Sequence, residues 1–201
     1  GTESSDFPTT LGIYDISYNS NGDAFLSRFN SDLTILLAST FLGGSDIDWA
    51  IDITIAIGGN IFVTGSTYSS DFPITQNAYD SSYNGSEDAF LSKLDGGLTS
   101  LLDSTFLGGS GNDRPHSMSI NSGGNILITG YTDSSNFPTT TGCYDTSHNG
   151  NEDAFVSRLN GNLTSLSAST FLGGSGTDRA YSIIIDSIGN VLITGYTWSY
   201  I

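Results

Sequence analysis

Apolar and polar residues alternate along four short runs in the last third of the chain. The runs are 153–159, 166–172, 181–186 and 191–195. In the third run Ile183 lies on one face and Ser182 on the other, which is typical of a half-buried antiparallel strand. Turn-forming residues such as Asn160-Gly161-Asn162 separate the runs. The pattern predicts four short strands joined in sequence, and no helix.

The same pattern occurs three times at a fixed step of 65 residues. Phe7-Pro8 recurs as Phe72-Pro73 and Phe137-Pro138, with no insertion or deletion between the copies. A long fixed period indicates supersecondary modules that bury their faces against one another. We therefore expect an all-β fold of β-propeller-type blades, with three 65-residue repeats that are each a four-stranded antiparallel meander. The expected units are the end of a preceding blade strand at 1–5 and blades at 6–70, 71–135 and 136–201. A parallel β-helix is the alternative.

Several motifs of the repeat resemble the SBBP repeat of bacterial and archaeal proteins, a family named for a seven-bladed β-propeller. They are Asp88-Ala89-Phe90-Leu91-Ser92-Lys93-Leu94, Ser104-Thr105-Phe106-Leu107-Gly108-Gly109-Ser110, Gly124-Asn125-Ile126-Leu127-Ile128-Thr129-Gly130 and Phe137-Pro138-Thr139-Thr140. The resemblance implies a propeller found mainly in exported or surface proteins, and it implies no single activity. It also predicts an extracellular or cell-surface location.

Three units are too few to close a propeller ring, so both ends of the stack would expose apolar surface. We expect self-association, either as two chains that close a six-bladed ring or as an open filament, unless the chain is part of a longer array.

The chain is strongly acidic, with 21 acidic and five basic residues and a formal net charge of −16. This balance disfavours nucleic acid as a partner and favours divalent cations. No apolar stretch is long enough for a membrane span, and Gly1 does not begin a basic and apolar leader. A mature secreted protein or a fragment would look the same.

Oxygen-bearing side chains alternate in each segment that links one blade to the next. They are Asp15, Ser17, Asn19, Asn21 and Asp23; Asp80, Ser82, Asn84, Ser86 and Asp88; and Asp145, Ser147, Asn149, Asn151 and Asp153. Calcium takes six to eight oxygen ligands, often from alternate positions of one loop. The pattern predicts three equivalent calcium sites, although Asx turns that cap their own backbone have the same composition.

A second set of charged residues follows the Gly-Gly pairs. Asp113 and Arg114 occur there together, and Asp178 and Arg179 repeat them. Equivalent placement predicts ion pairs or hydrogen bonds that fasten neighbouring strands or blades.

No set of residues breaks the repeat as a catalytic centre would be expected to do. His116 and His148 lack zinc-ligand spacing, and we interpret them as isolated surface histidines. We therefore predict no enzyme but an extracellular structural, self-assembling propeller, for example a subunit of a surface filament or adhesive layer. A propeller that binds a surface glycan or a protein, using aromatics such as Trp49, is the alternative, and a hydrolase is the least favoured.

Overall fold

The computed structural model describes residues 1–19 and 21–199 and contains twelve β-strands. They are β1 (Ala24–Phe29), β2 (Leu36–Leu42), β3 (Asp48–Ile55), β4 (Ile61–Thr67), β5 (Asp88–Leu94), β6 (Leu101–Leu107), β7 (Asp113–Ile120), β8 (Ile126–Thr132), β9 (Asp153–Leu159), β10 (Leu166–Leu172), β11 (Asp178–Ile185) and β12 (Val191–Thr197). The expected all-β class is confirmed. No helix among the described residues is long and apolar enough to cross a membrane.

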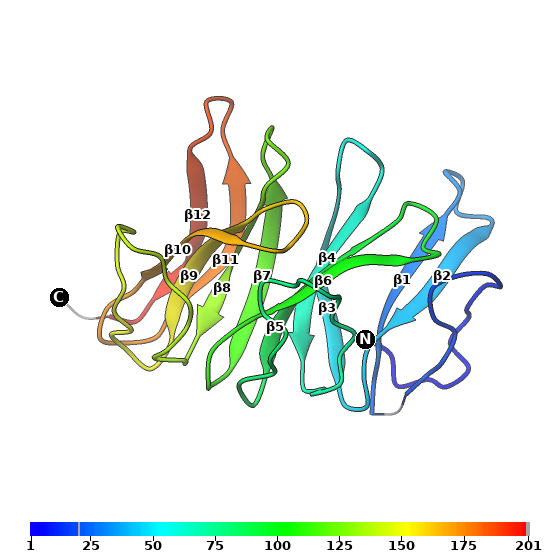
Figure 1. The fold of residues 1–201 in the computed structure, drawn as a ribbon, viewed down its shortest axis with the longest axis horizontal. Coiled ribbons are helices and arrows are strands. Elements are labelled where there is room, and N and C mark those ends of the chain that lie inside the picture. The colour runs from blue at the N-terminus through cyan, green and yellow to red at the C-terminus, as the bar shows by residue number, and fades with distance from the viewer. Residues whose placement is uncertain (20, 200–201) are drawn as a thin grey trace.

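The strands form four antiparallel sheets that lie side by side along the long axis of the molecule (Figure 1). Two are complete four-stranded meanders in the orders β3-β4-β5-β6 and β7-β8-β9-β10. The other two have two strands each, β1-β2 at one end of the chain and β11-β12 at the other. The four-stranded antiparallel meanders expected from the sequence are therefore confirmed.

Each complete sheet takes its strands from two successive sequence units. Sheet β3–β6 uses β3 and β4 from the unit 6–70 and β5 and β6 from the unit 71–135. Segment 68–87 separates β4 from β5, yet these strands pair along their whole length. The chain changes sheet instead at the Gly-Gly pairs after β2, β6 and β10. The phase of the sheets relative to the 65-residue unit thus differs from the expected one.

Strands β3, β7 and β11 each carry a β-bulge, which explains a glycine in the strand beside it. In β7 the register shifts between Pro115 and Ser117, opposite Gly130 of β8. The shift brings the carbonyl oxygen of Arg114 to 1.9 Å from the position that a Cβ on Gly130 would occupy. Real Cβ atoms do not approach so closely, so a side chain does not fit there. Gly65 and Gly195 meet Trp49 and Arg179 in the same way.

The hydrophobic core lies between successive sheets and not within one unit. One cluster fills the space between β1–β2 and β3–β6 and includes Phe72, Phe90 and Phe106. The other lies between the two complete sheets and includes Phe137, Phe155 and Phe171. Each sheet is therefore stabilised by its neighbours, as expected for stacked repeats.

Candidate functional site

The predicted calcium loops fold around their own carboxylates. In the second copy Asp80 Oδ1 accepts a hydrogen bond from the Ser82 N–H (2.8 Å), and Asp88 Oδ2 accepts one from the Asn84 N–H (2.8 Å). The Asn84 side-chain amide also donates to Asp80 Oδ2 (3.0 Å). The third copy repeats all three bonds around Asp145 and Asp153. These are the Asx turns that the sequence left open as an alternative.

The candidate ligands are not all brought together in these loops. Asn19, Asn21, Asn84, Ser86, Asn149 and Asn151 are exposed, Asp15, Asp80 and Asp145 are half-buried, and Asp23, Asp88 and Asp153 are buried. No group of three or more His, Cys, Asp or Glu side chains gathers as for a metal ion anywhere in residues 1–19 and 21–199. Calcium binding by the loops stays a prediction.

The buried aspartate of each loop faces a second aspartate, which begins the first strand of the following sheet. The pairs are Asp23 with Asp48, Asp88 with Asp113, and Asp153 with Asp178. Between them lies the first glycine of the Gly-Gly pair. A Cβ on Gly108 would stand 2.7 Å from Asp113 Oδ2 and 3.0 Å from Asp88 Oδ1. The glycine therefore permits the close approach of two carboxylates.

The two members of a pair differ in their hydrogen bonding. Asp113 accepts from the Gly109 N–H (2.7 Å), from the Ser134 hydroxyl (3.0 Å) and from the Thr132 hydroxyl. Asp88 Oδ1, by contrast, is buried without a hydrogen-bond partner among the described residues, and so are the Oδ1 atoms of Asp23 and Asp153. In the first pair Asp48 Oδ1 lacks a partner within the described part of the chain as well. A buried carboxylate oxygen without a partner is unfavourable, so such an atom points to a further ligand or a bound proton.

Burial shifts the acidity of these groups. It raises the pKa of Asp88 to about 7, with the Asp113 carboxylate adding to the shift, and it raises the pKa of Asp48 to about 6. At the open C-terminal end burial acts on Asp178 too, but hydrogen bonds from Thr197, Gly174 and Ser199 outweigh it and lower its pKa. Neutralising the interior pairs is therefore favourable near neutral pH.

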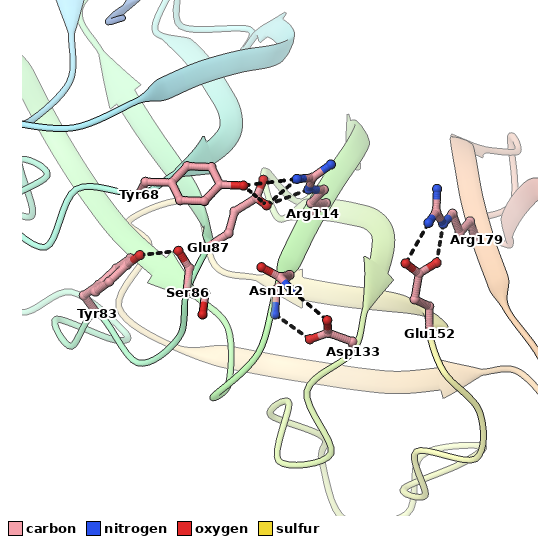
Figure 2. Close-up of polar contacts among 9 residues, drawn as sticks. All are labelled: Tyr68, Tyr83, Ser86, Glu87, Asn112, Arg114, Asp133, Glu152 and Arg179. Carbon is pink, nitrogen blue, oxygen red and sulfur yellow. Dashed lines mark hydrogen bonds and ion pairs between the residues drawn. The ribbon is translucent and has the colours of Figure 1, made fainter. Parts of the chain in front are cut away.

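Two ion pairs tie neighbouring sheets together, as Figure 2 shows. Glu87, just before β5, has a fully buried side chain and pairs with Arg114 of β7, with 2.6 Å between Oε2 and Nη2. The Tyr68 hydroxyl donates to the same carboxylate (2.7 Å). Glu152 and Arg179 form the equivalent pair one repeat later. The expected fastening role of Arg114 and Arg179 is confirmed.

The first copy lacks this ion pair and replaces both partners at once. Gly22 stands at the position of Glu87, and Trp49 at that of Arg114. Trp49 packs its ring edge against Tyr68, with 5.8 Å between the ring centroids. The sequence analysis did not single out the glutamate as the partner of the arginine. The two residues occur together in two copies, and this joint occurrence could have predicted the ion pair.

The interpretation of the histidines as isolated surface residues was wrong. His116 is the bulged residue of β7, is half-buried, and stacks on Tyr181 of β11 with 4.7 Å between ring centroids. Its Nδ1 lies 2.9 Å from the Ala180 carbonyl oxygen. His148 is half-buried as well, edge-on to Phe171. The bulge in β7 turns His116 toward β11, whereas His148 lies in the linker before β9.

The two incomplete sheets have complementary edges. Beside β11 and β12 lies an open hollow of about 580 Å³, lined by Ala154, Leu172, Gly195 and Tyr196 among others. One repeat earlier, the equivalent position at Gly130 is opposite Phe155 of β9, which is fully buried. The hollow is thus the place that a β9-like strand occupies in a complete sheet.

The comparison with protein families supports this description. A sequence model of the SBBP family, the beta-propeller repeat, matches residues 104–138 and 169–201. These two segments are SBBP repeats. The first SBBP match runs from β6 through β7 and β8 to Phe137-Pro138, and so crosses from one sheet into the next. No curated protein matches the chain.

Proposed function

We propose that this chain is an extracellular, non-catalytic structural protein whose propeller blades assemble end to end with further copies of the chain. The observation that carries the proposal is the complementarity of the two incomplete sheets. β1–β2 corresponds to the last two strands of a complete sheet, such as β5–β6, and β11–β12 corresponds to the first two, such as β7–β8. Together they contain the four strands of one complete sheet.

The complete sheets supply the register of the joint. β8 pairs with β9 in a ladder that runs from Ile126 opposite Leu159 to Thr132 opposite Asp153. Moved along by one repeat, the same ladder pairs β12 of one copy with β1 of a second copy, from Val191 opposite Phe29 to Gly195 opposite Phe25. The ladder stops there, because Thr2 of the same chain already pairs with Asp23. The joint would satisfy the edges of β12 and of β1 from Phe25 to Phe29, which otherwise present unpaired backbone groups.

Side chains on the two edges fit the same arrangement. In the complete sheets the Thr64 and Thr129 hydroxyls donate to the carbonyl oxygens of Phe90 and Phe155. Thr194 is exposed, and Phe25, which corresponds to Phe90, is 36% exposed. In the joint, Phe25 of the second copy enters the hollow at Gly195, and Thr194 donates to its carbonyl oxygen.

The extracellular assignment is supported by the SBBP repeats and by a surface rich in Ser, Thr, Asn and Gly with few charges. A structural role is supported by the repeated contacts, because the aspartate pairs recur in all three copies and the Glu–Arg pairs in two, where they fasten sheets. Either a closed pair of chains or an open filament contains the proposed joint.

The test is the mass of the assembly by light scattering at several concentrations. The wild-type chain is expected to form multiples of one chain. Phe25→Lys blocks the β1 edge and Thr194→Lys blocks the β12 edge, so each variant alone is expected to remain a single chain. A mixture of the two retains one intact joint and is expected to stop at two chains.

Leu11→Glu is the control, because Leu11 is exposed in a linker away from both edges. It is expected to assemble like the wild type. A wild-type chain that stays single at every concentration would contradict the proposal, as would assemblies that both lysine variants leave unchanged.

A further inference from the structure

Carbonyl and carboxylate oxygens converge where the linker of the second copy meets the loop after the Gly-Gly pair. A Cβ on Gly85 would lie 2.1 Å from the Gly111 carbonyl oxygen, 2.9 Å from Asp88 Oδ1 and 3.1 Å from the Gly109 carbonyl oxygen. In the third copy a Cβ on Gly150 would lie 2.0 Å from the Gly176 oxygen and 2.7 Å from the Gly174 oxygen. A side chain at either glycine would collide with these oxygens, so glycine is required where the linker and the loop come together.

The carboxylate beside these carbonyl oxygens has one oxygen without a hydrogen-bond partner among the described residues. This atom, Asp88 Oδ1, is buried; it lies near the Gly109 carbonyl oxygen on the side of Gly85 and near Asp113 Oδ2 on the side of Gly108. The nearest arginine in sequence, Arg114, is bound to Glu87 instead. Buried carboxylates are normally compensated by an opposite charge, whereas the side chain that faces Asp88 across Gly108 is Asp113, another carboxylate.

We propose that the second and third copies each bind a calcium ion at this point. The site in the second copy consists of Asp88, Asp113 and the carbonyl oxygens of Gly109 and Gly111. The site in the third copy consists of Asp153, Asp178 and the carbonyl oxygens of Gly174 and Gly176. Calcium is a hard cation that accepts mixed carboxylate, carbonyl and water oxygens in flexible geometry.

The ligand set differs from the one that the sequence predicts, because it shares only Asp88 and Asp153 with the linker loops. The remaining oxygens come from the segment between β6 and β7, where the chain passes from one sheet to the next. A bound ion would therefore fasten the linker to the crossover between sheets.

The first copy is excluded from the proposal on its sequence. It keeps Asp23 and Asp48, but Ser20 stands at the position of Gly85 and Asp46 at that of Gly111. Ser20 lies outside the described residues. The proposal thus predicts two ions per chain, whereas three equivalent linker loops would bind three.

The experiment is calorimetric titration of the chain with calcium chloride, together with thermal melting in chelator and in millimolar calcium at constant ionic strength. We expect two ions per chain and a melting temperature that rises by about 5 °C or more at a hundredfold excess over the dissociation constant. Coincident melting curves and no heat of binding would overturn the proposal and leave Asp88 neutralised by a proton.

Asp88→Asn separates this site from a general effect of charge. The variant places an amide where Oδ1 stood, so that it donates to the carbonyl oxygens while Oδ still accepts from Asn84. We expect the variant to melt in chelator like the wild type and to bind one ion instead of two. Asp88→Asn with Asp153→Asn is expected to bind none.

Asp80→Asn is the matched control, since Asp80 belongs only to the linker set and its oxygens accept from Ser82 and Asn84. It is expected to keep both ions. Loss of binding in Asp80→Asn, or two ions retained in the double variant, would overturn the proposed ligands.

Discussion

The interior sheets and the two end sheets have nearly the same sequence but very different burial. Phe90 is fully buried, whereas Phe25 at the equivalent position is 36% exposed. Ile126 is fully buried and Val191 is 43% exposed, and Leu127 is 4% exposed where Leu192 is 48% exposed. The local pattern is equal in each case, so the neighbouring sheet alone decides whether a residue becomes core. Apolar patches of this kind at both ends are typical of interaction surfaces.

The largest expected difference is between alanine substitutions of the two phenylalanines. Phe90→Ala removes a fully buried ring that stacks on Phe72 and should lower the free energy of unfolding by about 3–5 kcal/mol. Phe25→Ala should cost only about 1–2 kcal/mol while the chain is single, because the ring is partly solvated. Urea unfolding at low protein concentration measures both. Equal losses would show that the end sheet is as well packed as the interior.

The next largest effect concerns the ion pair that the interior copies have and the first copy lacks. Glu87→Gln weakens the bonds to Arg114 and Tyr68, and we expect a loss of about 1.5–3 kcal/mol in the free energy of unfolding, because the carboxylate is fully buried.

Asp103→Asn is the control for the ion pair. It breaks the pair with Lys93 within one sheet, whose carboxylate is more exposed than that of Glu87, and it should cost less than about 1 kcal/mol. The same chemical denaturation compares the two variants. A loss in Asp103→Asn that equals the loss in Glu87→Gln would argue against a special role of the contact between sheets.

A smaller difference is expected for the threonines that bond to the next strand. Thr129→Val removes the hydroxyl bond to the Phe155 carbonyl oxygen and should cost about 0.5–1.5 kcal/mol. Thr194→Val should change the stability of the single chain by less than about 0.5 kcal/mol, because its bonding partner would be another copy. Thermal melting at low concentration tests both, and a large loss in Thr194→Val would contradict the assignment of β12 as a free edge.

The smallest expected effect is a pH dependence from His116, which lies between two sheets. Burial lowers the pKa of His116, and the nearby Arg179 and Arg114 lower it further, while the bond to Ala180 opposes the shift. The folded state therefore binds this proton less readily than the unfolded state. Neutral His116 therefore does not lower the free energy of unfolding above the ordinary pKa of about 6.5. Below that pH the free energy of unfolding falls, because the unfolded state takes up the proton more readily.

The contribution of His116 is measured as the difference in the free energy of unfolding between the wild type and His116→Gln, from pH 7.5 to pH 5. The wild type should lose more stability toward pH 5 than the variant does. Parallel curves would place the imidazole in solvent. Tyr131 faces the same ring edge-on.

The strands and the period could be predicted from the sequence because the alternation of residues such as Ser182 and Ile183 is a local property of each strand. The phase of the sheets could not. The sequence shows that segment 68–87 is a long linker, but only packing reveals that it returns the chain to the same sheet, where Thr67 stands opposite Asp88. Sequence spacing does not say which connection crosses between sheets.

The candidate site was predictable in part for a similar reason. The repeated aspartates stood out, and the turns around Asp80 and Asp145 follow from local Asx chemistry. The meeting of Asp88 with Asp113 depends on a Gly-Gly approach across two strands, which no pattern within one loop indicates. The pairing of Glu87 with Arg114 likewise joins residues from two neighbouring sheets. The sequence did show that glutamate and arginine occur together in two copies and are both absent from the first.

Disulfide trapping directly tests the register of the joint between β12 of one copy and β1 of the next. With Cys143 replaced by serine, Val191→Cys and Phe29→Cys should place two thiols opposite each other across the joint, since directly opposed residues lie about 4.5–5.5 Å apart in antiparallel strands. Oxidation is then expected to link chains covalently through the joint. The offset pair Val191→Cys with Ser27→Cys should link poorly. No linkage in the first variant, or equal linkage in both, would contradict the proposed assembly.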